Sequence, residues 1–250
     1  MIKTLYKLHQ DLKAPVEEAY RTLRTNIQFC SIDKKIKTIA VTSSNPGEGK
    51  TTTCINLAVS MAKAGINTLL VDTDMRKPMD AKRLGAGLNI GLTNFISGLS
   101  ELDDVIGATS VPNLYFLACG PKPPNPAELM ATAAFKDFVS TVRERFDMVI
   151  FDTPPLGSVI DSALISALTD GTLLVIKSKT VNFKVVRRVK DQLDKVNARL
   201  LGVVLNKVEK SDYRNYYNYY YNYYGSIKNK ERKEQFDELK QFEEGRKVLT

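Results

Sequence analysis

The stretch that decides the fold is TIAVTSSNPGEGKTTT, residues 38–53, in which an apolar run passes into a glycine-rich loop. The loop matches the end of the phosphate-binding pattern GxxxxGK[ST] through Gly47, Gly49, Lys50 and Thr51. Glycines let the backbone turn tightly, so that successive N–H groups converge on a phosphate. The lysine supplies a positive charge and the threonine hydroxyl can hold Mg²⁺.

The alternative is a Gly/Pro turn that ends in GKT by chance. An apolar strand before the loop and a helical pattern after it disfavour this alternative, because the positive end of the helix dipole also favours an anion there. We therefore expect nucleotide phosphates to contact the loop and the first helical turn. The predicted contact residues are Gly47, Glu48, Gly49, Lys50, Thr51 and Thr52.

Short apolar runs alternate with helical patterns between Lys37 and Asn206. The runs at 38–42, 68–71, 113–117, 148–151, 173–176 and 201–205 predict strands, and 55–65, 135–142, 158–168 and 181–196 predict helices. Continuous Val/Ile/Leu strands separated by helices indicate an α/β fold, a phosphate-loop NTPase with a mostly parallel central sheet and helices on both faces. Ligands of such sheets bind at the carboxyl ends of the strands.

The chain divides by pattern into four segments. They are 1–35, an N-terminal helical segment; 36–207, the phosphate-loop core; 208–226, a tyrosine cluster; and 227–250, a tail of mixed charge. The tail has a thin apolar stripe, and both a short helix and a solvated chain fit it.

Carboxylates follow two of the predicted strands, Asp72 and Asp74 after one and Asp152 after another. Asp152 fits the Walker-B role of holding Mg²⁺, and Asp74 is expected to assist through water. Asp72 could accept the proton of a nucleophile or orient it. A single aspartate could be a helix cap, but three at two strand ends favour a functional site. The predicted catalytic residues are Lys50, Asp72, Asp74 and Asp152, and the predicted metal ligands are Thr51, Asp74 and Asp152.

Asn206 ends the last predicted strand, where its side chain could read a nucleotide base. An ordinary turn asparagine is the alternative.

Most of the tyrosines gather in one polar stretch, SDYRNYYNYYYNYYGS, residues 211–226. Asn, Asp, Arg and Gly separate them, and these residues favour turns and solvated chain. The stretch therefore predicts an exposed row of phenol hydroxyls. The eight residues are Tyr213, Tyr216, Tyr217, Tyr219, Tyr220, Tyr221, Tyr223 and Tyr224.

The formal net charge is +8, which suggests either anionic partners or ordinary solubilising charge. Three widely spaced cysteines without a CxxC pair indicate neither a disulfide framework nor a zinc site, and fit a reducing compartment. No apolar run approaches the roughly 18 residues that a membrane-spanning helix needs. The N-terminus lacks the apolar core of a signal peptide, so we expect a cytoplasmic protein.

Together these motifs resemble those of the bacterial tyrosine kinases of capsule and exopolysaccharide synthesis, phosphate-loop ATPases related to partition and division-site ATPases. The resemblance extends from about residue 14 to about residue 224. It rests on SSNPGEGKTTT (43–53), LLVDTDMRKP (69–78), VIFDTPP (149–155) and GPKPPNPAELM (120–130), the last being similar to the family's proline-rich GxxPPNPxELL signature. The tyrosine cluster lies where members of the family carry their autophosphorylated tail.

A fifth match, EAYRTLR at 18–24, is similar to the family motif ExxRxxR. The resemblance implies ring-like self-association through Glu18, Arg21 and Arg24, with the tail of one subunit entering its neighbour's site. The alternative is an ion pair within one helix, worth about 0.3–0.5 kcal/mol.

The resemblance also implies ATP and Mg²⁺ as cofactors and phosphoryl transfer to tyrosine. The implied partner is a separate membrane-anchored activator of the polysaccharide co-polymerase type, which would recruit the chain to the inner face of the plasma membrane. Other protein substrates and a tyrosine phosphatase are implied as further partners, and nucleic acid is not.

Two departures bear on the alternatives. Ser44 replaces the first glycine of the loop pattern, and Asn45 stands where partition ATPases carry a signature lysine. The second departure weakens the alternative of a partition or positioning ATPase that hydrolyses ATP without phosphorylating tyrosine. Another alternative makes the Tyr/Asn stretch a stacking surface for nucleic acid or sugar. Only Arg214 interleaves with the tyrosines, which disfavours nucleic acid.

Overall fold

The computed structural model describes residues 5–7, 12–31, 35–79, 90–180 and 182–209. The chain separates into two units, Met1–Lys207 and Val208–Thr250, and the account below concerns the first. The tyrosine cluster and the charged tail lie outside the described residues.

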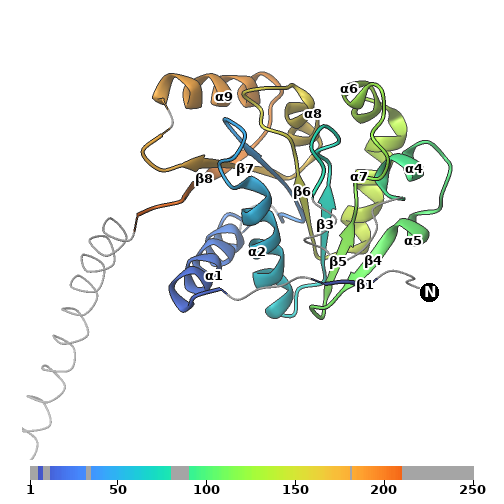
Figure 1. Ribbon diagram of the computed structural model, residues 1–250, viewed down its shortest axis with the longest axis horizontal. Coiled ribbons are helices and arrows are strands. Elements are labelled where there is room, and N and C mark those ends of the chain that lie inside the picture. The colour runs from blue at the N-terminus through green and yellow to red at the C-terminus, as the bar shows by residue number, and fades with distance from the viewer. Residues whose placement is uncertain (1–4, 8–11, 32–34, 80–89, 181, 210–250) are drawn as a thin grey trace, which may run out of the picture. The chain divides into compact units, whose positions relative to one another are not determined.

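An eight-stranded sheet forms the centre of the first unit (Figure 1). Its order is β1-β4-β5-β3-β6-β2-β7-β8, and the pairing is parallel except between β4 and β5. This confirms the predicted fold class, a mostly parallel sheet flanked by helices. The strands are β1 Leu5–Tyr6, β2 Thr38–Ser43, β3 Thr68–Asp72, β4 Ile106–Thr109, β5 Leu114–Leu117, β6 Met148–Asp152, β7 Gly171–Lys177 and β8 Leu200–Asn206.

Helices cover both faces of this sheet, as expected for buried parallel strands. They are α1 Ala14–Phe29, α2 Lys50–Lys63, α4 Leu92–Ile96, α5 Leu102–Val105, α6 Pro126–Met130, α7 Ala133–Arg145, α8 Asp161–Leu168 and α9 Phe183–Lys195. Alternate side chains of one strand enter different cores: Ile39 and Val41 of β2 pack on the side of α1 and α2, and Ala40 packs on the side of α7. Leu174 of β7 joins a third cluster with α8 and α9.

Several short elements were not predicted from the sequence. They are β1, β4, α4, α5 and α6, each with two to five residues. Elements this short hold too few residues to display a period. Only tertiary pairing reveals them, as when β4 adds antiparallel to β5 and β1 then pairs with β4.

The central strands bring three connections to one edge of the sheet. In β3 and β6, Asp72 is the register partner of Asp152. The loop after β2 is tied to the segment after β6, because Leu156 N donates to Ser43 O at 2.9 Å. None of the described helices is long and apolar enough to cross a membrane.

Candidate nucleotide site

The glycine-rich loop connects β2 to α2, as the sequence predicted. Gly47 and Gly49 have φ values of 78° and 97°, the left-handed region that side chains rarely adopt. A Cβ atom on Gly49 would lie 2.0 Å from Asn206 Nδ2, so the end of β8 presses directly on the loop. A Cβ atom on Gly157 would lie 2.0 Å from the carbonyl oxygen of Ser44, which closes the loop from the other side.

Helix α2 begins at Lys50, and its first N–H groups have no acceptor within the helix. Thr51 is half-buried and Thr52 is exposed in this first turn, beside the predicted phosphate position. The loop and the helix start therefore present N–H groups and a positive dipole end to the same place. This arrangement suits a bound phosphate.

Lys50 brings the predicted carboxylates together. Its Nζ lies 2.6 Å from Asp152 Oδ1 and 3.7 Å from Asp74 Oδ2, and all three side chains are at least nine-tenths buried. Burial alone would lower the pKa of the Lys50 ammonium, but the charge and hydrogen bond of Asp152, together with the charges of Cys54 and Asp74, outweigh this and raise the pKa. The lysine therefore stays charged.

Asp72 is fully buried, and the pKa of its carboxyl group is strongly raised. Its Oδ2 accepts from Met79 N at 2.7 Å and its Oδ1 from Asp74 N at 3.1 Å. Burial, with the charge of Asp152 second, raises the pKa of Asp72 to about 8. Burial also raises the pKa of Asp74, although Lys50 counteracts this. Lys50 thus pairs with two carboxyl groups, Asp74 and Asp152, while the third, Asp72, lies beside Asp152 in the strand register. Within this cluster the carboxyl groups outnumber the lysine.

One oxygen of this cluster has no partner among the described residues: Asp152 Oδ2 is buried and accepts no hydrogen bond. A buried unpaired carboxylate oxygen is costly unless a ligand or ion completes it. Cys54 Sγ lies 3.5 Å from the other oxygen, and burial raises the pKa of this thiol well above its usual value. The sequence analysis did not place Cys54 in the site.

Arg76 binds a residue that sequence reasoning missed. Its Nε and Nη2 donate to Asp161 Oδ2 and Oδ1 at 2.8 and 3.1 Å, a two-pronged pair. Asp161 is buried at the start of α8. The pair ties the segment that carries Asp74 to the helix that follows the Walker-B strand. Nothing local in the sequence signals a contact across 85 residues.

Asn206 lies against the loop, as its predicted place at the end of β8 requires. Its Nδ2 donates to Glu48 O at 2.9 Å, and its Oδ1 accepts from Lys207 N at 2.8 Å. Lys207 Nζ donates to Gly47 O at 2.8 Å. The first unit of the chain therefore ends on the nucleotide loop.

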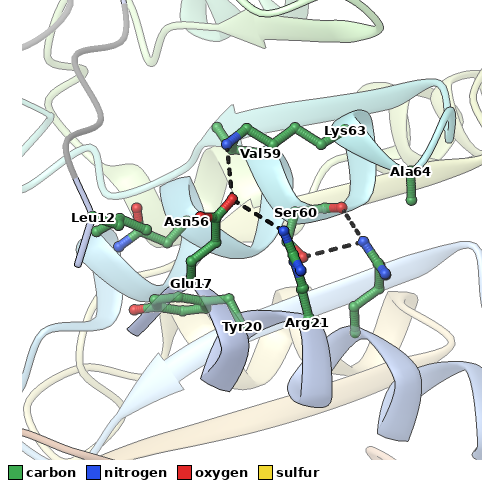
Figure 2. Close-up of a pocket in the computed structure, with 10 residues that line it drawn as sticks. Leu12, Glu17, Tyr20, Arg21, Asn56, Val59, Ser60, Lys63 and Ala64 are labelled. Atoms are coloured by element: carbon green, nitrogen blue, oxygen red, sulfur yellow. Dashed lines mark hydrogen bonds and ion pairs between the residues drawn. The ribbon is translucent and has the colours of Figure 1, made fainter. Parts of the chain in front are cut away.

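The predicted self-association residues lie on α1, which packs on α2 beside a cavity of about 290 Å³ (Figure 2). Glu18 and Arg21 are exposed and form the intrahelical pair at 3.5 Å that was the alternative reading. Arg24 instead faces α2, where its Nη1 donates to Ser60 O at 2.7 Å. Glu17, which the sequence did not single out, accepts from Lys63 Nζ of α2 at 3.1 Å.

The described part of the chain contains no group of three or more His, Cys, Asp or Glu arranged to hold a metal ion alone. A metal at this site would therefore need oxygens from Thr51 or from a phosphate as well. The eight phosphoacceptor tyrosines predicted from the sequence lie outside the described residues, so the structure does not place them.

Comparison with known proteins gives a matching family model and relatives named as tyrosine-protein kinases. A family model described as "AAA domain" matches residues 36–206. "Tyrosine-protein kinase CpsD" of Streptococcus agalactiae is 41% identical over 206 residues, which are 82% of this chain and 88% of the relative. "Tyrosine-protein kinase YwqD" of Bacillus subtilis is 39% identical over 189 residues, 76% of this chain and 80% of the relative. The crystal structure of the chimerical protein CapA2B2 superposes with a TM-score of 0.76 at 36% identity, covering 84% of this chain and 96% of that one.

Proposed function

The chain belongs to the AAA-domain family and, within it, to the bacterial tyrosine-protein kinases, and we propose that it transfers the γ-phosphoryl group of ATP to tyrosines of its own C-terminal cluster. The alternative of a partition-type ATPase is not favoured, because relatives that are about 40% identical over most of this chain are named tyrosine-protein kinases. The proposal therefore concerns the acceptor, the metal and the partners of a kinase.

One observation carries the choice of acceptor. Lys207, the last residue of the first unit, holds Gly47 O of the nucleotide loop, and Tyr213 follows it by only six residues. An extended chain spans at most about 3.6 Å per residue, so six residues can separate the first tyrosine of the cluster from that lysine by no more than about 22 Å. Tethering at such short range raises the effective concentration of the acceptors.

The site residues fit a magnesium ion. Asp152 Oδ2 is buried without a partner in the part of the chain that the structure describes, and Lys50 already pairs with both Asp74 and Asp152, so a divalent cation would balance the local charge. Thr51, Asp74 and Asp152 would hold it, in part through water. When bound, Mg²⁺ would supply positive charge that neutralises the phosphate oxygens.

The protein's own groups would act mainly by position and charge, since phosphoryl transfer has a loose transition state. Lys50, now held by Asp152, would donate to phosphate oxygens alongside the N–H groups of the loop. An incoming tyrosine is protonated, because its ordinary pKa is near 10. Asp72 is fully buried and both its oxygens accept backbone N–H groups. Because both oxygens are already used and shielded from solvent, we favour a role for Asp72 in orienting the site over direct acceptance of the tyrosine proton.

The proposed biological setting follows from the resemblance to kinases of capsule and exopolysaccharide synthesis. A separate membrane-anchored activator of the co-polymerase type would recruit the chain to the inner face of the plasma membrane. Glu18 and Arg21, both exposed, would contribute to a ring-like homo-oligomer, with Arg24 supporting α1 from within. Other protein substrates and a tyrosine phosphatase would complete the system, with no role for nucleic acid.

Phosphorylation would also change the charge of the chain. Each phosphotyrosine adds about −1.5 to −2 at pH 7, so eight would add about −12 to −16 to a chain at +8. Repulsion among these groups would release the tail and loosen an oligomer. In a chain with all eight tyrosines changed to phenylalanine, oligomer size should no longer respond to ATP. An oligomer size that is insensitive to ATP in the wild type as well would contradict this switch.

The phosphoryl acceptor can be tested with the wild type and two complementary variants. A Lys50→Met chain supplies acceptors without activity, and a chain with the eight tyrosines changed to phenylalanine supplies activity without acceptors. After incubation of the wild type with Mg²⁺, ATP and the activator, mass spectrometry should find phosphotyrosine between residues 213 and 224. In the mixture of the two variants, phosphotyrosine on the Lys50→Met chain would show transfer between subunits, and its absence would show transfer within one chain. Production of ADP and phosphate by the wild type without phosphotyrosine in this stretch would reject the proposal.

A further inference from the structure

The Glu48 side chain turns into the nucleotide loop instead of into solvent. The residue is 3% exposed. Its Oε2 accepts hydrogen bonds from Ser44 N at 2.8 Å and from Asn45 N at 3.0 Å, and its Oε1 accepts from Asn45 Nδ2 at 3.4 Å. The Glu48 carboxylate thus links the end of the loop to its beginning at Ser44 and Asn45, across the turn at Pro46.

These contacts fix the part of the loop where the sequence departs from the usual pattern. Ser44 stands in place of the first glycine and Asn45 in place of the lysine of partition ATPases. Their backbone N–H groups donate to an anion that the chain itself provides, and hydrogen bonds to an ionised acceptor are about twice as strong as neutral ones. The left-handed conformation of Gly47 reverses the chain, which lets the Glu48 side chain reach back.

The carbonyl groups of the same turn are held from the opposite side. Glu48 O accepts from Asn206 Nδ2 at 2.9 Å, and Gly47 O accepts from Lys207 Nζ at 2.8 Å. With N–H groups bound on one side and carbonyl groups on the other, the loop has its shape before a phosphate arrives. A preformed site avoids the entropic cost of ordering the loop on binding.

We propose that the Glu48 carboxylate is a positioning residue that holds the loop in its phosphate-binding conformation. It contacts no reacting atom, because its oxygens are used by Ser44 and Asn45. The inference rests on the proposed nucleotide site but not on the identity of the phosphoryl acceptor. Its natural readout is therefore the affinity for nucleotide.

The test compares Glu48→Ala and Glu48→Gln with the wild type in the full-length chain. Binding of a fluorescent ATP analogue, thermal unfolding, and the KM for ATP and kcat of autophosphorylation are measured for each. Glu48→Ala should weaken nucleotide binding about tenfold or more, with KM rising more than kcat falls, because loop order is lost while the reacting groups remain. Glu48→Gln should lie between, since its carbonyl oxygen can still accept from both N–H groups.

Glu144→Ala provides the matched control, because it removes one negative charge from an exposed position on α7. It should leave nucleotide affinity unchanged. A Glu48→Ala chain that melts earlier but binds nucleotide as tightly as the wild type would show a merely structural residue and overturn the proposal. Tighter binding by Glu48→Ala would overturn it too, since the carboxylate would then compete with phosphate. A wild type that binds ATP but forms no phosphotyrosine would reject the kinase proposal and leave this one standing.

Discussion

Two buried carboxylate sites lie at opposite ends of strand β2, and they are built in opposite ways. At the amino end, Asp170 Oδ2 accepts from Lys37 N, Thr38 N and Thr38 Oγ1 at 2.9–3.1 Å, and Arg143 binds both carboxylate oxygens at 3.2 Å. Burial alone would raise the pKa of Asp170, but the Arg143 pair and these hydrogen bonds lower it. The negative charge of the Asp170 carboxylate is therefore compensated by Arg143 and by its hydrogen-bond donors.

At the carboxyl end, Lys50 pairs with Asp74 and Asp152, Asp72 lies beside Asp152 in the strand register, and Asp152 Oδ2 has no partner among the described residues. Here burial raises the pKa of Asp72 to about 8. The amino-end site stabilises the fold by itself, whereas the carboxyl-end site is incomplete until a ligand supplies positive charge. The difference supports the proposal that the second site binds a ligand, because perturbed and incompletely paired ionisable groups gather at functional sites.

The largest expected effect comes from removing the Lys50 ammonium group at the carboxyl-end site. Lys50→Met should reduce tyrosine phosphorylation by about 10³-fold or to background, since one preorganised charge at a transition state is worth about 10²–10³. The assay is phosphotyrosine formed per minute with Mg²⁺ and ATP. Lys63→Met, an exposed lysine at the end of the same helix, serves as the control and should retain activity. Comparable activity in both variants would contradict the assignment.

At the amino end, Asp170→Ala should lower the free energy of unfolding by about 3 kcal/mol, because it leaves several buried donors without an acceptor. Urea denaturation measures this change. Asp170→Asn keeps one acceptor oxygen and should cost less. Nucleotide affinity of the folded protein should stay unchanged in both variants. A large loss of affinity would contradict a purely structural role for the Asp170 site.

Asp72→Asn separates stability from activity at the carboxyl end. A folded-state pKa of about 8 lies above the ordinary value of 3.8, so between these values the folded chain keeps a proton that the unfolded chain loses. Stability from this group is therefore present below pH 4 and is lost as the pH rises toward 8. The asparagine variant cannot ionise, so its stability relative to the wild type should rise between pH 5 and pH 8, while it phosphorylates tyrosine at least about tenfold more slowly. A stability difference that is the same at both pH values would contradict the raised pKa.

The smallest effect concerns thiol reactivity. Cys54 is buried beside Asp152 with its pKa raised, and Cys30 is half-buried at the end of α1. The thiolate is the reactive form, so an alkylating reagent at pH 7.5 should modify Cys30 first and leave Cys54 intact in the folded protein. Peptide mass mapping after brief labelling reads this out. Early labelling of Cys54 would mean that water reaches the carboxylate cluster freely.

The sequence predicted the parts of the site that local patterns encode. An apolar strand followed by aspartate located Asp72 and Asp152, and the glycine-rich loop located Lys50, because both signals lie within a few residues. The partners of these residues were not predictable. Asp170 with Thr38, and Arg76 with Asp161, join residues 132 and 85 positions apart, which only the packed sheet brings together. The antiparallel strand β4 was missed for the same reason, since its pairing with β5 determines it.

The incomplete charge of the carboxyl-end site is tested most directly by the free energy of unfolding at pH 5 and pH 8, with and without saturating Mg²⁺ and ADP, in the wild type and in Asp72→Asn. The ligand should stabilise the wild type more at pH 8 than at pH 5, because it compensates a carboxyl group that is charged only at the higher pH. This extra increment should shrink in Asp72→Asn. The claim that a bound ligand compensates buried negative charge at this site would be contradicted by either of two results. One is a stabilisation by ligand that is equal at both pH values in the wild type, and the other is an extra stabilisation at pH 8 that Asp72→Asn leaves unchanged.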